Sequence, residues 1–124
     1  MANNKIKTVS AQSAKQILFM TQPSAAVGVV MSATGATAVG GRKIQKAGTP
    51  IKGDLTARNT AFTKAGESDA VGVLLHDVDV TDGDENATCL IFGFVDLNKM
   101  ETDAAALITE SVKTALAGKI TFLK

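Results

Sequence analysis

The chain has 124 residues, of which 45% are hydrophobic and 20% are charged. These values predict one globular domain and exclude a disordered or collagen-like chain. Trp and Tyr are absent and only five Phe are present, so the core must consist largely of small aliphatic side chains, which bury less area per residue. We therefore expect the chain to associate with other copies, because association covers apolar surface that a small core leaves open.

The charges are divided unevenly along the chain. The first 64 residues carry nine Lys or Arg against one acid, Asp54, whereas residues 65–124 carry eleven acids against four Lys. The two parts therefore have net charges of +8 and −7, although the whole chain is close to neutral at +1. Two interpretations remain open: the parts face different neighbours through complementary charge, or they neutralise each other within one domain.

Residues 1–24 predict an extended N-terminal arm, followed by a single domain over residues 25–124. The arm is polar and basic, and it has too little apolar content to form a core by itself. Its one apolar run favours an arm that binds another surface over a frayed terminus, because such a run in a free tail lowers solubility. We expect neither a signal peptide nor a transmembrane helix, because no apolar run is long enough. The apolar run and the basic residues of the arm are Ile17, Leu18, Phe19, Met20, Lys5, Lys7 and Lys15.

Strand patterns follow the arm. Residues 27–31 and 42–46 predict a hairpin, and Thr49 with Pro50 forms a turn signal before two short edge strands at residues 51–55 and 61–64. The strongest pattern is a β-hairpin of residues 70–80 and 87–97, separated by a polar segment. Apolar side chains alternate onto both faces of its first run. Both faces should therefore be covered, by barrel-like closure, by a packed helix or by a partner subunit.

The C-terminal part predicts one helix and a last strand. Residues 102–117 have apolar residues at helical spacing, with Thr102 or Asp103 at the start and Gly118 after the end as capping residues. Residues 119–124 alternate between polar and apolar and predict a strand. The predicted fold is therefore mainly β with one helix, a small α+β and compact β-barrel-like or β-tulip-like domain. The apolar positions of the helix are Ala104, Ile108, Val112 and Leu116.

The chain lacks the residues that most catalytic mechanisms need. His76 is the only histidine and falls inside a predicted strand, which favours a structural role over a nucleophile-activating one. Cys89 has no second cysteine to pair with and predicts a buried thiol in a strand. The glycine-rich residues 35–42 lack the Lys-Ser/Thr of a phosphate-binding loop. We therefore expect no enzymatic activity, no catalytic residue and no cofactor.

An acidic cluster near residue 80 raises the question of a calcium site. It does not fit the EF-hand pattern, because Asp82 replaces the required Gly and Thr88 replaces the final Glu. A solvated hairpin tip, or an acidic patch for a basic neighbour, is favoured over a looser ion site. Nucleic-acid binding is not expected, because the basic part lacks Tyr, Trp and a compact cationic cluster. The cluster consists of Asp77, Asp79, Asp82, Asp84 and Glu85.

Three segments, taken in their order and spacing, resemble the lambda-type phage head decoration proteins. In that family a Thr-Pro-aliphatic turn precedes short strands, and an Ala-Val-Gly-aliphatic strand leads through a polar loop into a second strand. A helix and a terminal strand then close the domain. The resemblance covers about residues 45–124 and is carried by Ala47-Gly-Thr-Pro-Ile-Lys-Gly-Asp-Leu55, Asp69-Ala-Val-Gly-Val-Leu-Leu-His-Asp77 and Ala87-Thr-Cys-Leu-Ile-Phe-Gly-Phe-Val-Asp96.

The resemblance implies a virion protein that binds the outer surface of the expanded capsid as a homotrimer. It would lie at threefold and quasi-threefold positions and stabilise the head against the pressure of the packaged DNA. Its partners would be the major capsid protein and its own copies, with no direct contact to nucleic acid or membrane. It would be made in the host cytoplasm. Capsid contacts are assigned to Lys5, Lys7, Lys15, Ile17, Leu18, Phe19, Met20, Thr49 and Pro50.

Two alternatives remain for the function. The first is another trimeric virion component, such as a head fibre or a tail protein. The sequence has no internal repeat or heptad run, which argues against a fibre shaft. The second is a small β-barrel ligand-binding module, which requires a concave site with converging polar groups.

Overall fold

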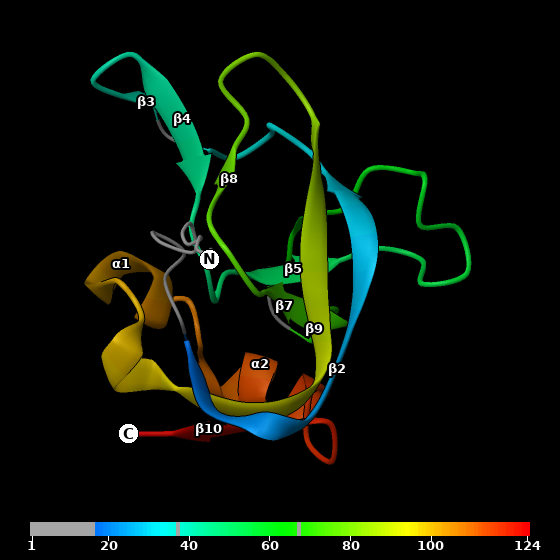
Figure 1. The fold of residues 1–124 in the computed structure, drawn as a ribbon, viewed down its shortest axis with the longest axis vertical. Helices are drawn as coiled ribbons and strands as arrows, with labels where there is room; N and C mark the ends of the chain where they lie inside the picture. The colour runs from blue at the N-terminus through cyan, green and yellow to red at the C-terminus, as the bar shows by residue number, and fades with distance from the viewer. Residues whose placement is uncertain (1–16, 37, 67) are drawn as a thin grey trace, which may run out of the picture.

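The computed structural model describes residues 17–36, 38–66 and 68–124, and it contains two sheets and two short α-helices (Figure 1). The predicted mainly β, small α+β fold is confirmed. The larger sheet has six strands in the order β10-β9-β7-β5-β6, with β2 also paired to β9. The smaller sheet has the order β3-β4-β8. The bounds are β2 (Leu18–Met31), β3 (Ala38–Val39), β4 (Arg42–Gln45), β5 (Pro50–Lys52), β6 (Thr63–Lys64), β7 (Gly72–Leu74), β8 (Val78–Asp79), β9 (Glu85–Asp96) and β10 (Ile120–Leu123).

The larger sheet is not closed into a barrel, which corrects the predicted barrel-like closure. Its path begins at β10 and ends at β6, and within the described ranges no pairing joins these two strands. Closure needs long strands whose tilt and stagger agree around a ring. Here β5, β6 and β7 have only two or three residues each, which is too short to continue the curved sheet of β2 and β9.

Strand β9 is the centre of the sheet, and its two faces cover two separate cores. Along one edge it pairs antiparallel with β2 over most of its length, and along the other edge it pairs antiparallel with β7 and then parallel with β10. Cys89 belongs to one core together with Met31 and Phe62, whereas Leu90 belongs to the other together with Val112. For residues 70–80 the prediction that both faces are covered is confirmed, because Val73 packs in one of these cores and Leu74 packs in the other. Helix residues cover one face, and loop and strand residues cover the other.

The predicted pairing of residues 70–80 with residues 87–97 is confirmed only in its first part. Strands β7 and β9 pair antiparallel, with Val73 opposite Leu90. The chain then bends, so that His76 lies after β7 and not within a strand, and β8 pairs with β4 instead. Asp77 stabilises this bend, because its carboxylate accepts a hydrogen bond of 2.7 Å from the Ala47 amide.

The predicted hairpin of residues 27–31 and 42–46 is wrong. Residues 27–31 belong to β2 and pair with β9, where Val29 and Met31 enter the core. Strand β4 instead pairs with β3, across a tight turn at Gly40 and Gly41. Both glycines have positive φ angles, of 62° and 82°, which two-residue hairpin turns require. The two predicted short strands are present as β5 and β6, which pair antiparallel, but only β6 lies at an edge, because β5 also pairs with β7.

The predicted single helix is divided into α1 (Thr102–Ala105) and α2 (Glu110–Ala115). The Thr109 backbone is extended, and its hydroxyl accepts a hydrogen bond from the Val112 amide, so Thr109 caps α2 and interrupts the predicted helix. Glu101, not Thr102 or Asp103, occupies the N-cap position of α1, and no side-chain capping hydrogen bond is formed there. Gly118 has the predicted positive φ after α2, and the last strand is present as β10. In the described part of the chain no helix is long and apolar enough to span a membrane.

Strand β2 crosses the predicted boundary between arm and domain at residue 24. Ile17 and Leu18 are 0% and 7% exposed and pack in the same core as Val95 and Ile120. Burying such a side chain is worth about 1.5 to 3 kcal/mol, so pairing with β9 is strongly favoured over a free arm. Residues 17–24 therefore belong to the domain. Residues 1–16 lie outside the described part of the chain.

Cys89 is buried in β9 as predicted, and burial raises the pKa of its thiol to about 11. Because the thiolate is the reactive form, we expect Cys89 to react with Ellman's reagent at pH 8 only after unfolding in denaturant. The rate of colour release in native buffer and in urea measures this. Rapid labelling of the folded protein would show that β9 opens locally.

Candidate interaction surface

The structure divides the residues that the sequence assigns to capsid binding into three groups. Thr49 and Pro50 are buried, and their carbonyls accept hydrogen bonds from Leu74 and Ala65, so they join β5 to its neighbours. Their assignment as surface contacts is corrected, as is that of the buried Ile17 and Leu18. Phe19 and Met20 are exposed. Lys5, Lys7 and Lys15 lie outside the described residues.

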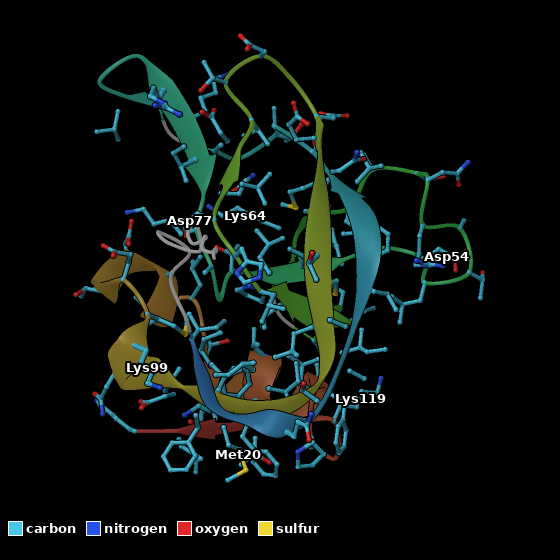
Figure 2. All side chains as sticks on the ribbon, viewed as in Figure 1. Met20, Asp54, Lys64, Asp77, Lys99 and Lys119 are labelled. Carbon is cyan, nitrogen blue, oxygen red and sulfur yellow. The ribbon has the colours of Figure 1, made fainter. Side chains whose placement is uncertain are left out.

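Phe19 and Met20 belong to a larger exposed surface on β2 and β9, which we call the aromatic face and define as Phe19, Met20, Phe92 and Phe94. Met20 lies directly opposite Phe94 in the β2–β9 pairing, and opposed residues share one face of a sheet. Phe92 lies two residues from Phe94 and shares that face. Figure 2 shows Met20 pointing away from the core, with Lys99 and Lys119 on either side of it.

The aromatic face is unusual for a chain that is poor in aromatic residues. Phe19, Met20 and Phe92 are 50%, 42% and 41% exposed, and Phe94 is half-buried. Only Phe62 is fully buried, and Phe122 packs partly against the core. Three of the five Phe therefore lie on one exposed surface. Contiguous exposed apolar surface of this kind is typical of interaction sites.

Sequence reasoning missed Phe92 and Phe94. The run that forms β9 is apolar at nearly every position, and alternation alone does not reveal which of its side chains meet solvent. One signal was present in the sequence. Two Phe separated by one residue in a strand share a face, and in a chain with so few aromatic residues such a pair marks that face.

The edge of β2 is less suited to binding than the aromatic face. The pairing of β2 with β9 shifts register three times between Leu18 and Ala26, and Pro23, which has no amide hydrogen to donate, lies among these shifts. Bulges and prolines interrupt the regular row of donors and acceptors that an added strand would pair with. The candidate contact is therefore formed by side chains and not by backbone pairing.

The two oppositely charged parts of the chain meet inside the domain. Ion pairs join Arg42 to Asp79, Lys46 to Asp103 and Lys52 to Asp69, each linking the basic part to the acidic part. These contacts support neutralisation within one domain.

The acidic residues near residue 80 stabilise the local backbone. Hydrogen bonds from the hydroxyl and amide of Thr81, together with Arg42, lower the pKa of Asp79 to about 2. The Asp84 carboxylate accepts a hydrogen bond of 3.0 Å from the Ala33 amide. Among the residues that the structure describes, no group of three or more His, Cys, Asp or Glu is arranged to hold a metal ion.

No family model matches the chain, and no curated protein is significantly similar to it. The fold and the exposed surface therefore describe the chain as a small, mainly β domain that carries the aromatic face.

Proposed function

We propose that this chain is a non-enzymatic capsid decoration protein of a phage. In this proposal it binds the outer surface of the expanded head as a homotrimer at threefold and quasi-threefold positions. It stabilises the shell against the pressure of the packaged DNA. The aromatic face contacts the major capsid protein.

The order of elements supports the proposal. The three segments that resemble the decoration family lie in the fold as β5, β7 and β9, and they are followed by two short helices and the terminal strand β10. The turn at Thr49 and Pro50 opens β5, which pairs with β7, and β7 pairs with β9. The resembling segments therefore form one continuous part of the larger sheet.

The aromatic face is the observation that carries the proposal. From the sequence alone, Phe19 and Met20 were expected to contact a capsid. In the structure both are exposed, beside two further phenylalanines. A protein that acts alone would gain nothing from this surface, whereas a binding protein buries it on its target. Each contact can be weak. Three linked subunits bind with an effective affinity well above that of one.

Stabilisation of the head follows from linkage. A trimer that binds the assembled shell, and not the dissociated capsid subunits, lowers the free energy of the shell by its binding free energy. Rupture must then first release the decoration protein. No catalytic chemistry is needed for this effect.

Co-sedimentation tests the proposal. Expanded, undecorated shells of a phage major capsid protein are mixed with purified protein and pelleted. We expect the protein to pellet with the shells, and the double variant Met20→Ser with Phe92→Ser to bind at least tenfold more weakly, because exposed apolar contact area is lost. The double variant Asn59→Ser with Thr60→Ala changes the exposed loop between β5 and β6 and should bind normally.

Two outcomes would contradict different parts of the proposal. If the unchanged protein stays in the supernatant at saturating concentration, it is not a decoration protein of that shell. If it pellets and the Met20 and Phe92 variant pellets equally well, the aromatic face is not the capsid contact. Sedimentation equilibrium tests the trimer separately, and a species of one 12.8 kDa chain at all concentrations would exclude it.

A further inference from the structure

Lysines flank the aromatic face on two sides (Figure 2). The Lys99 ammonium donates a hydrogen bond of 3.0 Å to the Leu18 carbonyl, one residue before the face begins. On the other side, the Lys119 carbonyl accepts a hydrogen bond of 3.0 Å from the Gly93 amide, in the middle of the aromatic part of β9. Both lysines are exposed. The apolar surface therefore has a cationic rim, which we define as Lys99 and Lys119.

The register of β10 places Lys119 on the outer side of the sheet. Ile120 is buried and lies beside Gly93 in the parallel pairing with β9. Successive side chains of a strand point to opposite faces, so Lys119 and Thr121 both take the outer side. Thr121 is exposed and lies beside Phe94. A partner that rests on the aromatic face thus also meets the outer side of β10 and the Lys119 ammonium.

The charges of the rim are not neutralised by ion pairs. Lys46, Lys52 and Lys113 are each paired with a carboxylate at 3.0 to 3.4 Å. Over residues 17–36, 38–66 and 68–124, by contrast, no carboxylate forms an ion pair with Lys99 or Lys119. The two lysines beside the apolar surface are therefore free to pair with acids of another molecule.

The acidic cluster near residue 80 lies at the opposite end of β9 from the rim (Figure 1). Glu85 begins β9 and Phe94 follows nine residues later, which is about 30 Å along a strand. The Debye length in physiological salt is only about 8 Å, so the cluster does not neutralise the rim. Asp96 is closer, but its carboxylate caps the 3-10 helix η2 (Leu97–Lys99). The rim keeps its positive charge.

An apolar face with a cationic rim fits a protein surface with the opposite rim. Protein interfaces have an apolar centre and a polar edge, and opposite charges at the edge steer encounter and fix the register. Two lysines are few for nucleic acid or an anionic membrane, because affinity for either grows with the number of basic residues. Phe94 is also half-buried, which limits stacking of a base on its ring. A protein partner is favoured.

We propose that the aromatic face binds an apolar protein surface flanked by Asp or Glu side chains, which pair with Lys99 and Lys119. The identity of this partner as the major capsid protein rests on the proposed function, whereas its chemistry rests on the rim. Exposed ion pairs add little affinity by themselves. Their main effect is to orient the protein on its target and to make binding depend on salt.

Methionine methyl NMR tests this chemistry without a capsid. Full-length protein labelled at the methionine methyl groups is titrated with two peptides, one alternating Leu with Asp and the other alternating Leu with Lys. Met20 is exposed whereas Met31 and Met100 are buried, so the Met20 methyl reports contact with the face, and Met20→Leu assigns its signal. We expect the acidic peptide to shift this signal at a concentration at least tenfold lower. Equal shifts, or no shift at millimolar peptide, would overturn the proposal.

Charge variants test the rim itself. Lys99→Gln with Lys119→Gln should bind the acidic peptide about fivefold more weakly at 50 mM NaCl, with an unchanged circular dichroism spectrum. In 1 M NaCl, where the Debye length is about 3 Å, it should bind as the unchanged protein does. Lys119→Gln alone leaves the hydrogen bond of Lys99 in place and should still weaken binding about twofold.

Lys43→Gln with Lys64→Gln is the matched control. It removes the same charge from β4 and β6 and should bind the acidic peptide normally. If this variant loses as much affinity as the rim variant, net charge attracts the peptide and the rim has no part in binding. A shift of the Met20 signal at lower concentrations of oligothymidylate or phosphatidylserine vesicles would also contradict the proposal, and would assign the face to a nucleic acid or a membrane.

Co-sedimentation with expanded shells distinguishes this proposal from the capsid role. If the shells do not bind the protein but the peptide preference holds, the capsid role is wrong and an acidic partner is still supported. If the shells bind the unchanged protein and the Lys99 and Lys119 variant equally well at 50 mM NaCl, the capsid role stands. The acidic rim of the partner is then wrong.

Discussion

Replacing Phe62 with alanine is expected to lower the free energy of unfolding by about 3 to 5 kcal/mol. Phe62 is 0% exposed and packs in the core that contains Met31 and Cys89. Its ring also lies against the backbone of Gly53, where an added Cβ would be 2.6 Å from the ring. The neighbouring side chains are mostly aliphatic and cannot expand to fill the lost volume, so a cavity remains. Urea unfolding followed by circular dichroism measures the change.

Phe92→Ala is the matched control for Phe62→Ala. It removes the same side chain from the same protein, but Phe92 lies on the aromatic face and is 41% exposed. The expected loss is below about 1 kcal/mol, as for most substitutions at exposed positions. If both variants lose similar stability, the aromatic face is covered in solution, and sedimentation of each variant would show whether a second copy covers it.

Replacing Gly72 with alanine is expected to lower the free energy of unfolding by about 1 to 3 kcal/mol, as overpacking of a core does. A Cβ at this position would lie 2.5 Å from the Leu90 carbonyl oxygen and 2.6 Å from the Cys89 sulfur. The closest of these atoms belongs to the backbone of β9, which cannot move away without weakening the pairing of Val73 with Leu90. The midpoint of thermal or urea unfolding measures the effect.

Gly28→Ala is the control for Gly72→Ala. Gly28 also lies in a strand of the larger sheet, and a Cβ built there would meet no atom within 4 Å. Alanine restricts the unfolded chain more than glycine does, so this variant should keep or gain up to about 1 kcal/mol of stability. If Gly28→Ala lowers the free energy of unfolding as much as Gly72→Ala does, the effect comes from replacing glycine in a strand and not from the close approach of Gly72 to β9.

Much of the fold could be predicted because it depends on short stretches of sequence. The helical spacing of Ala104, Ile108, Val112 and Leu116 predicts four buried positions, and all four are buried. Glycine at position 118 predicts the end of the last helix, and alternation predicts β10. These features arise from neighbouring residues in the chain, so local periodicity is sufficient to identify them.

Other features could not be predicted because they depend on residues that are distant in sequence. Residues 27–31 have a strand pattern, but the pattern does not name β9 as the partner across more than fifty residues. The division of the predicted helix at Thr109 has a local cause instead, because the hydrogen bond from the Val112 amide to the Thr109 hydroxyl competes with helical continuation, and apolar periodicity does not reveal it. The candidate site shows the same division. Phe19 and Met20 could be identified from their position in a polar segment, whereas Phe92 and Phe94 lie in an apolar strand and only their spacing marked them.

By itself, the sequence determined which side chains are apolar and where most of the strands lie. The tertiary structure alone decided that Ile17 and Leu18 enter the core while Phe19 and Met20 remain outside. The physical reason lies in the pairing of β2 with β9: its register shifts between Leu18 and Met20, so Leu18 lies opposite the buried Val95 and Met20 lies opposite Phe94. The aromatic face is the outer side of that same pairing.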